Sequence, residues 1–228
     1  CPKLQTALAD EEVENKESKG HFWSIRYPLE GNPGEGIVVA TTRPETLFGD
    51  VAVAVHAEDE RYKHLIGKRV LIPIINRAIP IIADEHADPT KGTGAVKITP
   101  AHDFNDFEVG QRHQLKPIVA MNLDATLNHE AGPYAGMERF AARKKLVAEL
   151  EEKGLLVSVE DRLINIPYCY RSGDVVEPSL LSQWYVKMRP LAEPALACVD
   201  RGDTRFVPER YVKTYRQWLE PFRDWCIS

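Results

Sequence analysis

The stretch that decides the fold runs from Gly92 to Asp106 and has the sequence GTGAVKITPAHDFND. Ala95 to Thr99 has the composition of a strand, and Asp103 is placed as the N-cap of a short helix that runs toward His113. Two glycines followed by a strand do not form a dinucleotide-binding loop, which requires a helix at that point. The stretch therefore predicts a strand followed at once by a helix.

Polar side chains meet at this predicted junction. Lys97 and Thr99 share one face of the strand because its side chains alternate, while Asp103 and Asp106 lie in the first helical turn. An acid at a helix N-terminus is favoured in its ionised form, which suits an acceptor for a substrate ammonium group. The alternative is that both aspartates only cap the helix. Either way, Lys97, Thr99 and Asp106 are the candidate catalytic residues and Asp103 a candidate substrate-binding residue.

A second motif, TTRPET, runs from Thr41 to Thr46. Thr42 and Glu45 have the spacing of a capping box at the start of a helix, and Arg43 adds a forked donor beside it. A helix start binds anionic groups, so Thr42 and Arg43 are predicted to bind substrate, although a well-capped surface turn is the alternative. Gly92 and Gly94 join this set because a backbone without Cβ atoms can approach a ligand closely.

The rest of the chain predicts a sheet-rich α+β protein. A hairpin over 22–42 opens it, and the unbroken apolar run 51–55 is typical of a strand covered on both faces. Further strands are predicted at 70–75, 79–82, 155–159 and 163–167, a helix at 137–153 with Gly154 after its end, and a last amphipathic helix from Pro208 to Leu219.

Composition excludes several classes of protein. The 228 residues contain 29 Lys and Arg against 34 Asp and Glu, a net charge of −5, with 43% hydrophobic residues, so disorder, collagen and coiled coil are excluded. The apolar runs are much shorter than the roughly 18 residues of a membrane span, and no secretory signal opens the chain. We therefore predict an intracellular, cytoplasmic protein without a membrane partner, and the absence of an initial Met suggests a piece of a longer chain.

Metal binding is a third possibility, because His86, Asp88, His102 and Asp103 are ligand types. No HExxH or paired CxxC motif supports it. Cys1 to Leu4 and Cys169 to Ser172 resemble two halves of a zinc knuckle in which Leu4 and Ser172 stand where second thiolates would be needed. We predict no bound zinc. A basic tilt in the last third of the chain indicates a solvated face or an approach to phosphates.

Together, TTRPETLFGD at Thr41 to Asp50 and the stretch from Gly92 to Asp106 resemble the editing domains of class I aminoacyl-tRNA synthetases for valine, isoleucine and leucine. The apolar run after Asp50 and the Lys97-Ile98-Thr99 segment are similar to the valyl type. Further valyl-like pieces are Cys1-Pro2, Asp84 to Asp88, Glu177-Pro178, Gln183 to Val186 and Asp224 to Ser228. The resemblance covers nearly the whole chain, whereas the HIGH and KMSKS signatures of the family's ligase site are absent.

The resemblance implies an ester hydrolase that removes threonine from mischarged valine tRNA, with threonyl-adenylate as another substrate. It implies that Asp106 binds the α-ammonium group, that Lys97, Thr99 and Asp103 surround the threonine side chain and ester, and that Thr42 and Arg43 form the facing wall. Lys91 stands where this family can place an aromatic residue against the adenine. His102 is expected to lie behind the residues that contact substrate.

The implied fold is a barrel-like β core with peripheral helices. The expected division is a connector at 1–14, an editing domain at 15–182 and a return connector at 183–228 that leads to the catalytic domain. The expected partners are the acceptor end of valine tRNA, its threonine moiety and that catalytic domain in cis, in a monomer. No cofactor is expected in this segment, whereas the parent enzyme uses ATP and Mg. Two alternatives stay open, a non-catalytic docking module that binds tRNA through Arg139, Arg143 and Lys144, and a leucyl or isoleucyl editing domain.

Overall fold

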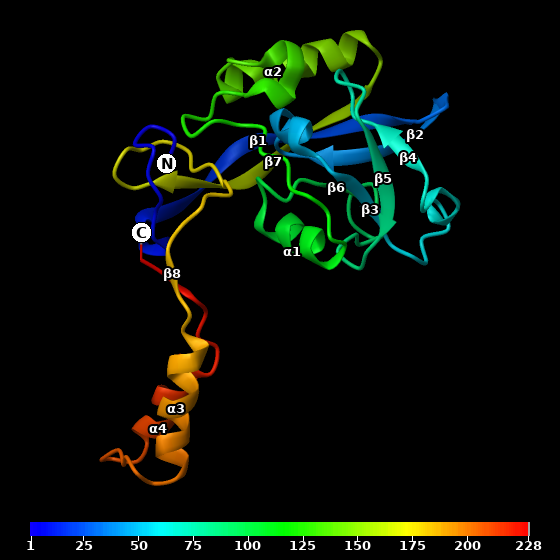
Figure 1. Cartoon of the computed structure of the whole chain (residues 1–228). Coiled ribbons are helices and arrows are strands. Elements are labelled where there is room, and N and C mark those ends of the chain that lie inside the picture. The colour runs from blue at the N-terminus through cyan, green and yellow to red at the C-terminus, as the bar shows by residue number, and fades with distance from the viewer. Residues whose placement is uncertain (228) are drawn as a thin grey trace. The chain divides into compact units, whose positions relative to one another are not determined.

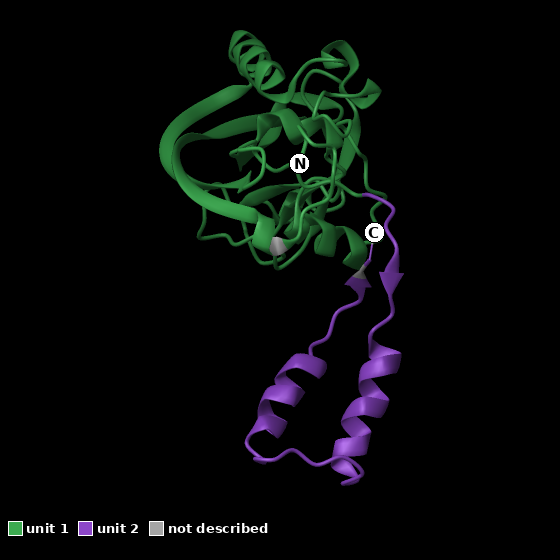
Figure 2. Cartoon of the chain, turned by 90° about the vertical axis from the view of Figure 1, so that its left-hand side faces the viewer, with its two compact units in different colours: residues 1–180 green, residues 181–228 purple. Residues whose placement is uncertain are grey.

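The computed structural model describes residues 1–227 of the chain, which form two compact units, residues 1–180 and 181–228 (Figure 2). The first unit contains strands β1 (Val13–Leu29), β2 (Asn32–Thr41), β3 (Ala52–Val55), β4 (Arg69–Leu71), β5 (Ala78–Ala83), β6 (Ala95–Ile98) and β7 (Leu156–Cys169), helices α1 (Phe104–Arg112) and α2 (Arg139–Glu152), and 3-10 helices η1 (Asp10–Glu12), η2 (Pro44–Gly49), η3 (Lys63–Leu65) and η4 (His129–Tyr134). The second contains β8 (Tyr185–Val186), α3 (Arg189–Asp200), α4 (Tyr211–Leu219) and β9 (Trp225–Cys226).

Seven strands of the first unit form one strongly curved sheet (Figure 1). Its hydrogen-bonded path runs β2-β1-β4-β5-β3-β6, and β7 pairs with β1 from Val13 to Ile25. All pairs are antiparallel except β3 with β5. At the ends of the path β6 lies beside β2, but the ladders of the described residues do not join the two strands. The fold is thus α+β with a barrel-like β core and peripheral helices, as predicted, and its sheet is not closed.

Strand β3 separates two cores, which explains its unbroken apolar sequence. Val53 and Val55 belong to the main core with residues of β1 and β2, whereas Ala52 and Ala54 face a second core with Val109 of α1. Leu146 and the other buried residues of α2 complete the main core. The two helices therefore cover different sides of the sheet, as Figure 1 shows.

Both predicted helices of the first unit are confirmed at their caps. The Asp103 side chain accepts hydrogen bonds from the backbone N–H groups of Asn105 and Asp106, which starts α1. Helix α2 starts two residues after the expected position, capped by Glu138, and the chain leaves it through Gly154 at φ +67°. These local signals determine where the helix termini point, and α1 brings Asp106 back toward β6.

Three predictions of local structure need correction. The strands expected at 155–159 and 163–167 are one strand, β7, because the long edge of β1 offers backbone partners to the polar residues Glu160 to Arg162 between them. The strand expected at 70–75 ends at Leu71. Helix α3 was not predicted, because Pro190 and Pro194 within it are typical of helix breaks.

Among the described residues, no helix is long and apolar enough to cross a membrane.

Candidate functional site

A polar cavity of about 220 Å³ lies between the end of β2, strand β6 and the start of α1. Its lining contains six of the eight predicted site residues, namely Thr42, Arg43, Lys97, Thr99, Asp103 and Asp106. The structure therefore brings the two sequence motifs together around one space. Gly92 and Gly94 are not among the residues that line it.

The floor of the cavity is a buried network around Lys97. Its Nζ donates to Thr46 Oγ1 and to Asp50 Oδ1, each at 2.9 Å, and to Thr99 Oγ1. Thr99 Oγ1 in turn donates to Asp50 Oδ1 at 2.6 Å, and the Tyr27 hydroxyl donates to Asp50 Oδ2 at 2.6 Å. Every titratable group of this floor is thus held by internal partners, and Lys97 is a structural cation as well as a lining residue.

Asp106 is the acid with a free side. Its Oδ2 accepts the backbone N–H of Thr99 at 2.8 Å, while Oδ1 meets only His86 Nε2 at 3.7 Å within the described part of the chain. Burial raises the pKa of Asp106 to about 7, with help from the charges of Asp103 and Asp50 and against the opposing effect of Lys97. A cationic group that enters the cavity and pairs with Oδ1 would favour the ionised carboxylate.

His102 lines the cavity, and its ring is held in place by contacts within the fold. Its side chain is fully buried, Nε2 accepts the backbone N–H of Ala120 at 3.0 Å, and Nδ1 lies 3.2 Å from the carbonyl oxygen of Pro178. This pattern assigns the ring proton to Nδ1. Because both nitrogens are engaged, His102 is not available as a metal ligand, and the candidate ligands are reduced to His86, Asp88 and Asp103.

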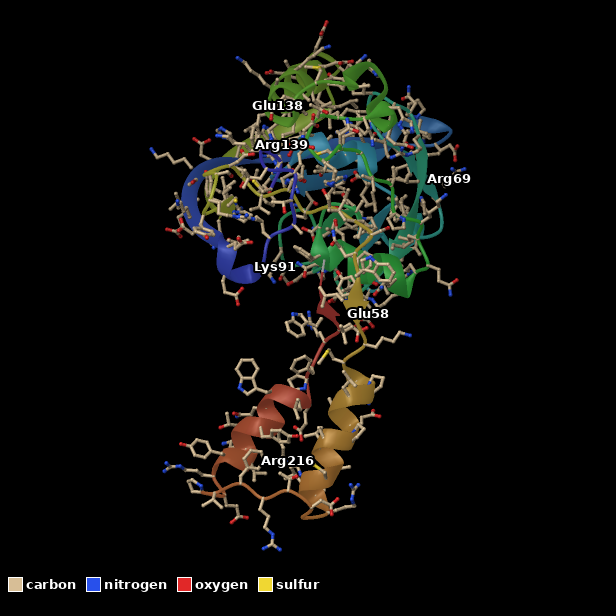
Figure 3. The ribbon with its side chains drawn as sticks, turned by 60° about the vertical axis from the view of Figure 1, so that its left-hand side comes forward. Glu58, Arg69, Lys91, Glu138, Arg139 and Arg216 are labelled. Atoms are coloured by element: carbon tan, nitrogen blue, oxygen red, sulfur yellow. The ribbon has the colours of Figure 1, made fainter. Side chains whose placement is uncertain are left out.

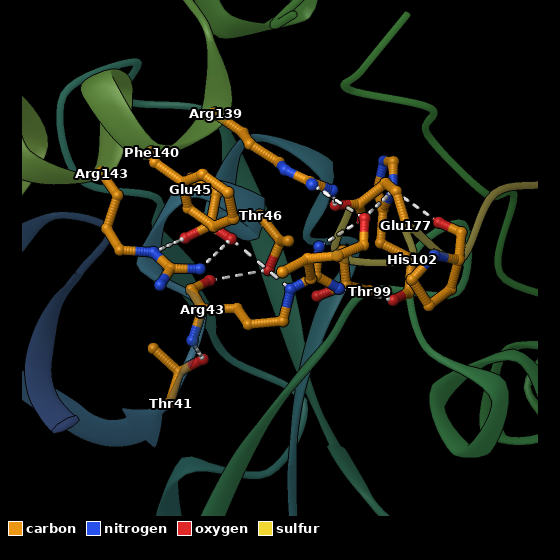
Figure 4. Close-up of polar contacts among 12 residues, drawn as sticks. Thr41, Arg43, Glu45, Thr46, Thr99, His102, Arg139, Phe140, Arg143 and Glu177 are labelled. Carbon is orange, nitrogen blue, oxygen red and sulfur yellow. Dashed lines mark hydrogen bonds and ion pairs between the residues drawn. The ribbon is translucent and has the colours of Figure 1, made fainter. Parts of the chain in front are cut away.

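Arg43 forms one wall of the cavity and is held by acids on its other side. Its guanidinium binds Glu177, lies 3.4 Å from Glu45 Oε1, and donates to the His102 carbonyl oxygen at 3.1 Å (Figure 4). Although burial of Glu177 opposes ionisation, Arg43 and His102 lower the pKa of that carboxyl to about 2. The wall is therefore a permanently charged pair.

The predicted capping box at Thr42 and Glu45 is wrong. Arg43 is the N-cap of η2 and no side chain caps the helix. The Glu45 side chain is fully buried and points to Arg143, whose Nε and Nη2 each lie 2.7 Å from its oxygens. A bidentate arginine is a stronger partner for a buried carboxylate than a backbone N–H, so tertiary pairing overrides the local motif.

Figure 4 shows Arg139 and Arg143 reaching from α2 to these acids. Arg139 Nη1 donates to Glu177 Oε2 at 2.9 Å and Nη2 to the Val175 carbonyl oxygen at 2.8 Å, and the residue is only 2% exposed. Both arginines that were candidates for tRNA docking are thus engaged inside the fold, whereas Lys144 is exposed.

The glycine-rich segment before β6 has a structural partner of its own. A Cβ on Gly94, at φ +78°, would lie 2.3 Å from Arg61 Nη2, and Arg61 is paired with Asp59. The Lys91 side chain lies at the surface (Figure 3) and is 82% exposed. It pairs with Asp88 across 3.2 Å.

The two halves of a zinc knuckle do lie side by side. Cys1 Sγ is 3.1 Å from Ser172 Oγ, and hydrogen bonds from Ser172 and from the Arg171 backbone lower the pKa of the Cys169 thiol. Within the described residues, no group of three or more His, Cys, Asp or Glu side chains is arranged to hold a metal ion. Ser172 occupies a position that a ligand set would need.

Three residues of the site were not identified from the sequence. Asp50 lies at the end of the TTRPETLFGD motif and Glu177 within a valyl-like dipeptide, but neither has a local pattern that reveals its partner. Tyr27 is one of two buried aromatic residues of β1.

Comparisons with known proteins agree with these motifs. The family model of tRNA synthetases class I (I, L, M and V) matches residues 1–228. Valine–tRNA ligases of Geobacter sulfurreducens and Thermosynechococcus vestitus are each 56% identical over the whole chain, and that of Thermotoga maritima is 50% identical. The chain spans about a quarter of the length of these relatives, 26%, 25% and 26% respectively.

A chain from the crystal structure of the ternary complex of Agrobacterium radiobacter LeuRS, tRNA and LeuAMS is similar over 74% of this chain and 25% of its own length, with a TM-score of 0.49 and 22% identity.

Proposed function

The chain belongs to the family of class I tRNA synthetases (I, L, M and V), and on that premise we propose that its polar cavity is the editing site of a valine–tRNA ligase. The proposed reaction is hydrolysis of the ester between threonine and valine tRNA, with threonyl-adenylate as another substrate. The parent enzyme would supply the ligase site, with ATP and Mg, and would present the acceptor end of its tRNA.

One observation carries this proposal, the free Oδ1 of Asp106 in a cavity that also exposes a hydroxyl-bearing floor. An aminoacyl ester carries an α-ammonium group, and threonine adds a hydroxyl. Asp106 would bind the ammonium group, and Thr99, one residue past the end of β6, lies beside it because its own N–H binds the same carboxylate. Asp103 and Thr42 line the same space.

Such a site can exclude valine and accept threonine. The pocket of the ligase site that activates valine excludes threonine only weakly. A hydrophobic pocket built for valine discriminates weakly against an isostere that adds a hydroxyl. In a polar cavity, valine would leave buried polar groups without partners, at roughly 1–3 kcal/mol for each group. The second pocket thus selects by hydrogen bonding where the first selects by size.

We infer that water attacks the ester carbonyl directly. No cysteine lines the cavity, and the Thr46 hydroxyl donates to the Arg43 carbonyl oxygen, which is not a base. The Thr99 hydroxyl donates to Asp50, but that carboxylate also accepts from Lys97 and Tyr27, which hold it in the buried ion pair of the floor. Positioning of the ester by Asp106 and the fixed charges of Arg43 and Lys97 would then supply the main contributions.

The contacts weaken the alternative of a docking module. A basic surface that binds phosphates needs free cations, yet Arg139 and Arg143 are engaged by Glu177 and Glu45. The expected connectors at 1–14 and 183–228, the catalytic domain in cis, the monomeric state and the cytoplasmic location remain predictions.

The test compares release of threonine and of valine from valine tRNA by the chain and by its Asp106→Ala variant. The same pair is measured after grafting the chain in place of the matching quarter of the Geobacter sulfurreducens ligase, which presents the acceptor end. The matched control is Asp161→Ala, because Asp161 is 90% exposed and does not line the cavity.

Rapid loss of threonine but not valine, dependent on Asp106 and unaffected by Asp161→Ala, is the expected result. Equal rates for Asp106→Ala and its parent in the graft, with circular dichroism showing both folded, would rule out this site. Preferential deacylation of mischarged leucine tRNA or isoleucine tRNA would instead indicate an editing domain of the leucyl or isoleucyl type.

A further inference from the structure

The buried Asp50 carboxylate has its hydrogen-bond partners in fixed directions. Its side chain is fully buried and forms an ion pair with Lys97. Tyr27 keeps its proton, because burial and the neighbouring Asp50 raise its pKa well above the usual value, and it therefore donates to Oδ2. An ionised carboxylate only accepts hydrogen bonds, so the hydrogen of the 2.6 Å contact with Thr99 belongs to Thr99.

This assignment fixes the direction of the Thr99 hydroxyl. A hydroxyl offers one hydrogen and two lone pairs. The hydrogen of Thr99 points to Asp50, and one lone pair accepts from Lys97. The second lone pair is what Thr99 can offer to a molecule in the cavity that it lines.

Lys97 adds no donor to the floor. An ammonium group has three N–H bonds, and those of Lys97 are directed to Thr46, Asp50 and Thr99. Thr46 in turn donates its hydrogen to the Arg43 carbonyl oxygen at 2.9 Å. The floor therefore offers two acceptors to the cavity, the free Oδ1 of Asp106 and the second lone pair of Thr99. The hydrogens of Lys97, Thr46 and Thr99 are all directed to partners within the protein.

We propose that Asp50 is a positioning residue that holds Thr99 as a hydrogen-bond acceptor, so that the cavity selects an aminoacyl side chain carrying an O–H donor. The proposal rests on the proposed editing function and adds its selection rule. The substrate hydroxyl must donate to Thr99, while the α-ammonium group donates to Asp106. A side chain that can only accept a hydrogen bond at the same place would meet a lone pair and be rejected.

The first experiment uses the unaltered chain in the graft with three esters of valine tRNA. The esters carry threonine, 2-amino-3-fluorobutyrate and 2-aminobutyrate, which place a hydroxyl, a fluorine and a hydrogen at one position. Fluorine is smaller than a methyl group and accepts but never donates a hydrogen bond. We expect the fluorinated and unsubstituted esters to be hydrolysed at similar rates, each at least tenfold more slowly than the threonyl ester.

Hydrolysis of the fluorinated ester as fast as the threonyl ester would overturn the proposal, because a donor from the protein would then be recognising the substituent. That outcome leaves the editing function intact. Failure of the protein to hydrolyse the threonyl ester at all would instead overturn the proposed function.

The second experiment tests Asp50 with a pair of variants. Asp50→Ala removes the acceptor, so the Thr99 hydrogen is free to turn into the cavity, and the preference for threonine over the fluorinated ester should fall toward one. Asp50→Asn keeps a carbonyl oxygen that Lys97 attracts to the same place, so this conservative variant should retain the preference. If folded Asp50→Ala hydrolyses the threonyl and fluorinated esters in the same ratio as the parent, the role of Asp50 is overturned. The first experiment uses the unaltered chain, so it decides the selection rule even if Asp50→Ala does not fold.

Discussion

Lys97 and Asp50 form a buried ion pair with Nζ 2.9 Å from Oδ1, although 47 positions separate them in the sequence. The pair joins the end of the TTRPETLFGD motif to strand β6, and Thr46 and Thr99 bond to the same ammonium group. Two motifs that are remote in the chain thereby form one cavity floor. The stability of this floor and its chemistry therefore depend on the same contacts.

The pKa of Asp106 predicts a pH-dependent stability. The folded value is about 7 and the unfolded value about 3.8, so between these values the folded state binds more protons than the unfolded state. The contribution of Asp106 to the free energy of unfolding therefore falls as pH rises from about 4 through 7, by up to about 4 kcal/mol. In Asp106→Asn this loss disappears, so the variant should gain in Tm relative to the parent chain between pH 5 and pH 8. Parallel Tm curves for the two proteins would contradict the raised pKa.

Removing the charge of Glu177 should destabilise the wall. Its side chain is 4% exposed and pairs with both Arg43 and Arg139, so Glu177→Gln leaves buried cations short of a partner and should lower the free energy of unfolding by about 3 kcal/mol. Because the folded pKa is depressed to about 2, this contribution is complete above about pH 4.5 and is lost as pH falls toward 2. Urea unfolding at pH 7 and pH 3 measures both effects.

The control is Glu30→Gln, which removes an exposed pair with Arg69 at 3.6 Å and should change stability by less than about 0.5 kcal/mol. Equal effects of Glu177→Gln and Glu30→Gln would show that the wall is not held by charge.

Arg143 should matter for folding and not for binding tRNA. Arg143→Met leaves Glu45 buried with only a 3.4 Å approach from Arg43, so we expect a loss of about 3 kcal/mol in stability. The salt dependence of tRNA binding by folded protein should keep its slope, because no phosphate contact is lost. Lys144→Ala is the exposed comparison and should leave stability unchanged. A reduced slope for Arg143→Met would restore the docking hypothesis.

Gly94 should be required by its left-handed backbone conformation. An alanine there combines φ +78° with a Cβ 2.3 Å from Arg61 Nη2, so Gly94→Ala should cost about 2 kcal/mol of stability. Gly92→Ala, at φ +54° with open space around it, should cost about 1 kcal/mol. Deacylation per folded molecule should persist in both variants. A drop in kcat/KM for folded Gly94→Ala would show that the backbone here contacts substrate, as the glycine pattern first suggested.

The predictable part of the site is its local part. Alternation along β6 placed Lys97 and Thr99 on one face, and the helix signal at Asp103 placed Asp106 in the first turn, both of which the structure confirms. The capping pattern at Thr42 and Glu45 failed because Arg143, 98 positions from Glu45, offers a better partner. A local motif is correct only where no distant group competes for the same atoms.

The sequence by itself determined the α+β class, the hairpin of β1 and β2, the doubly covered β3 and the junction of β6 with α1, because periodicity and caps act over a few residues. The tertiary structure alone decided which charges are buried and which atoms pair. Asp50 and Glu177 acquire their roles only when segments 47 and 134 positions away close around them. Burial then raises the pKa of Asp106 and the network orients the Thr99 hydroxyl, since desolvation and hydrogen-bond direction depend on everything that surrounds a group and not on its neighbours in the chain.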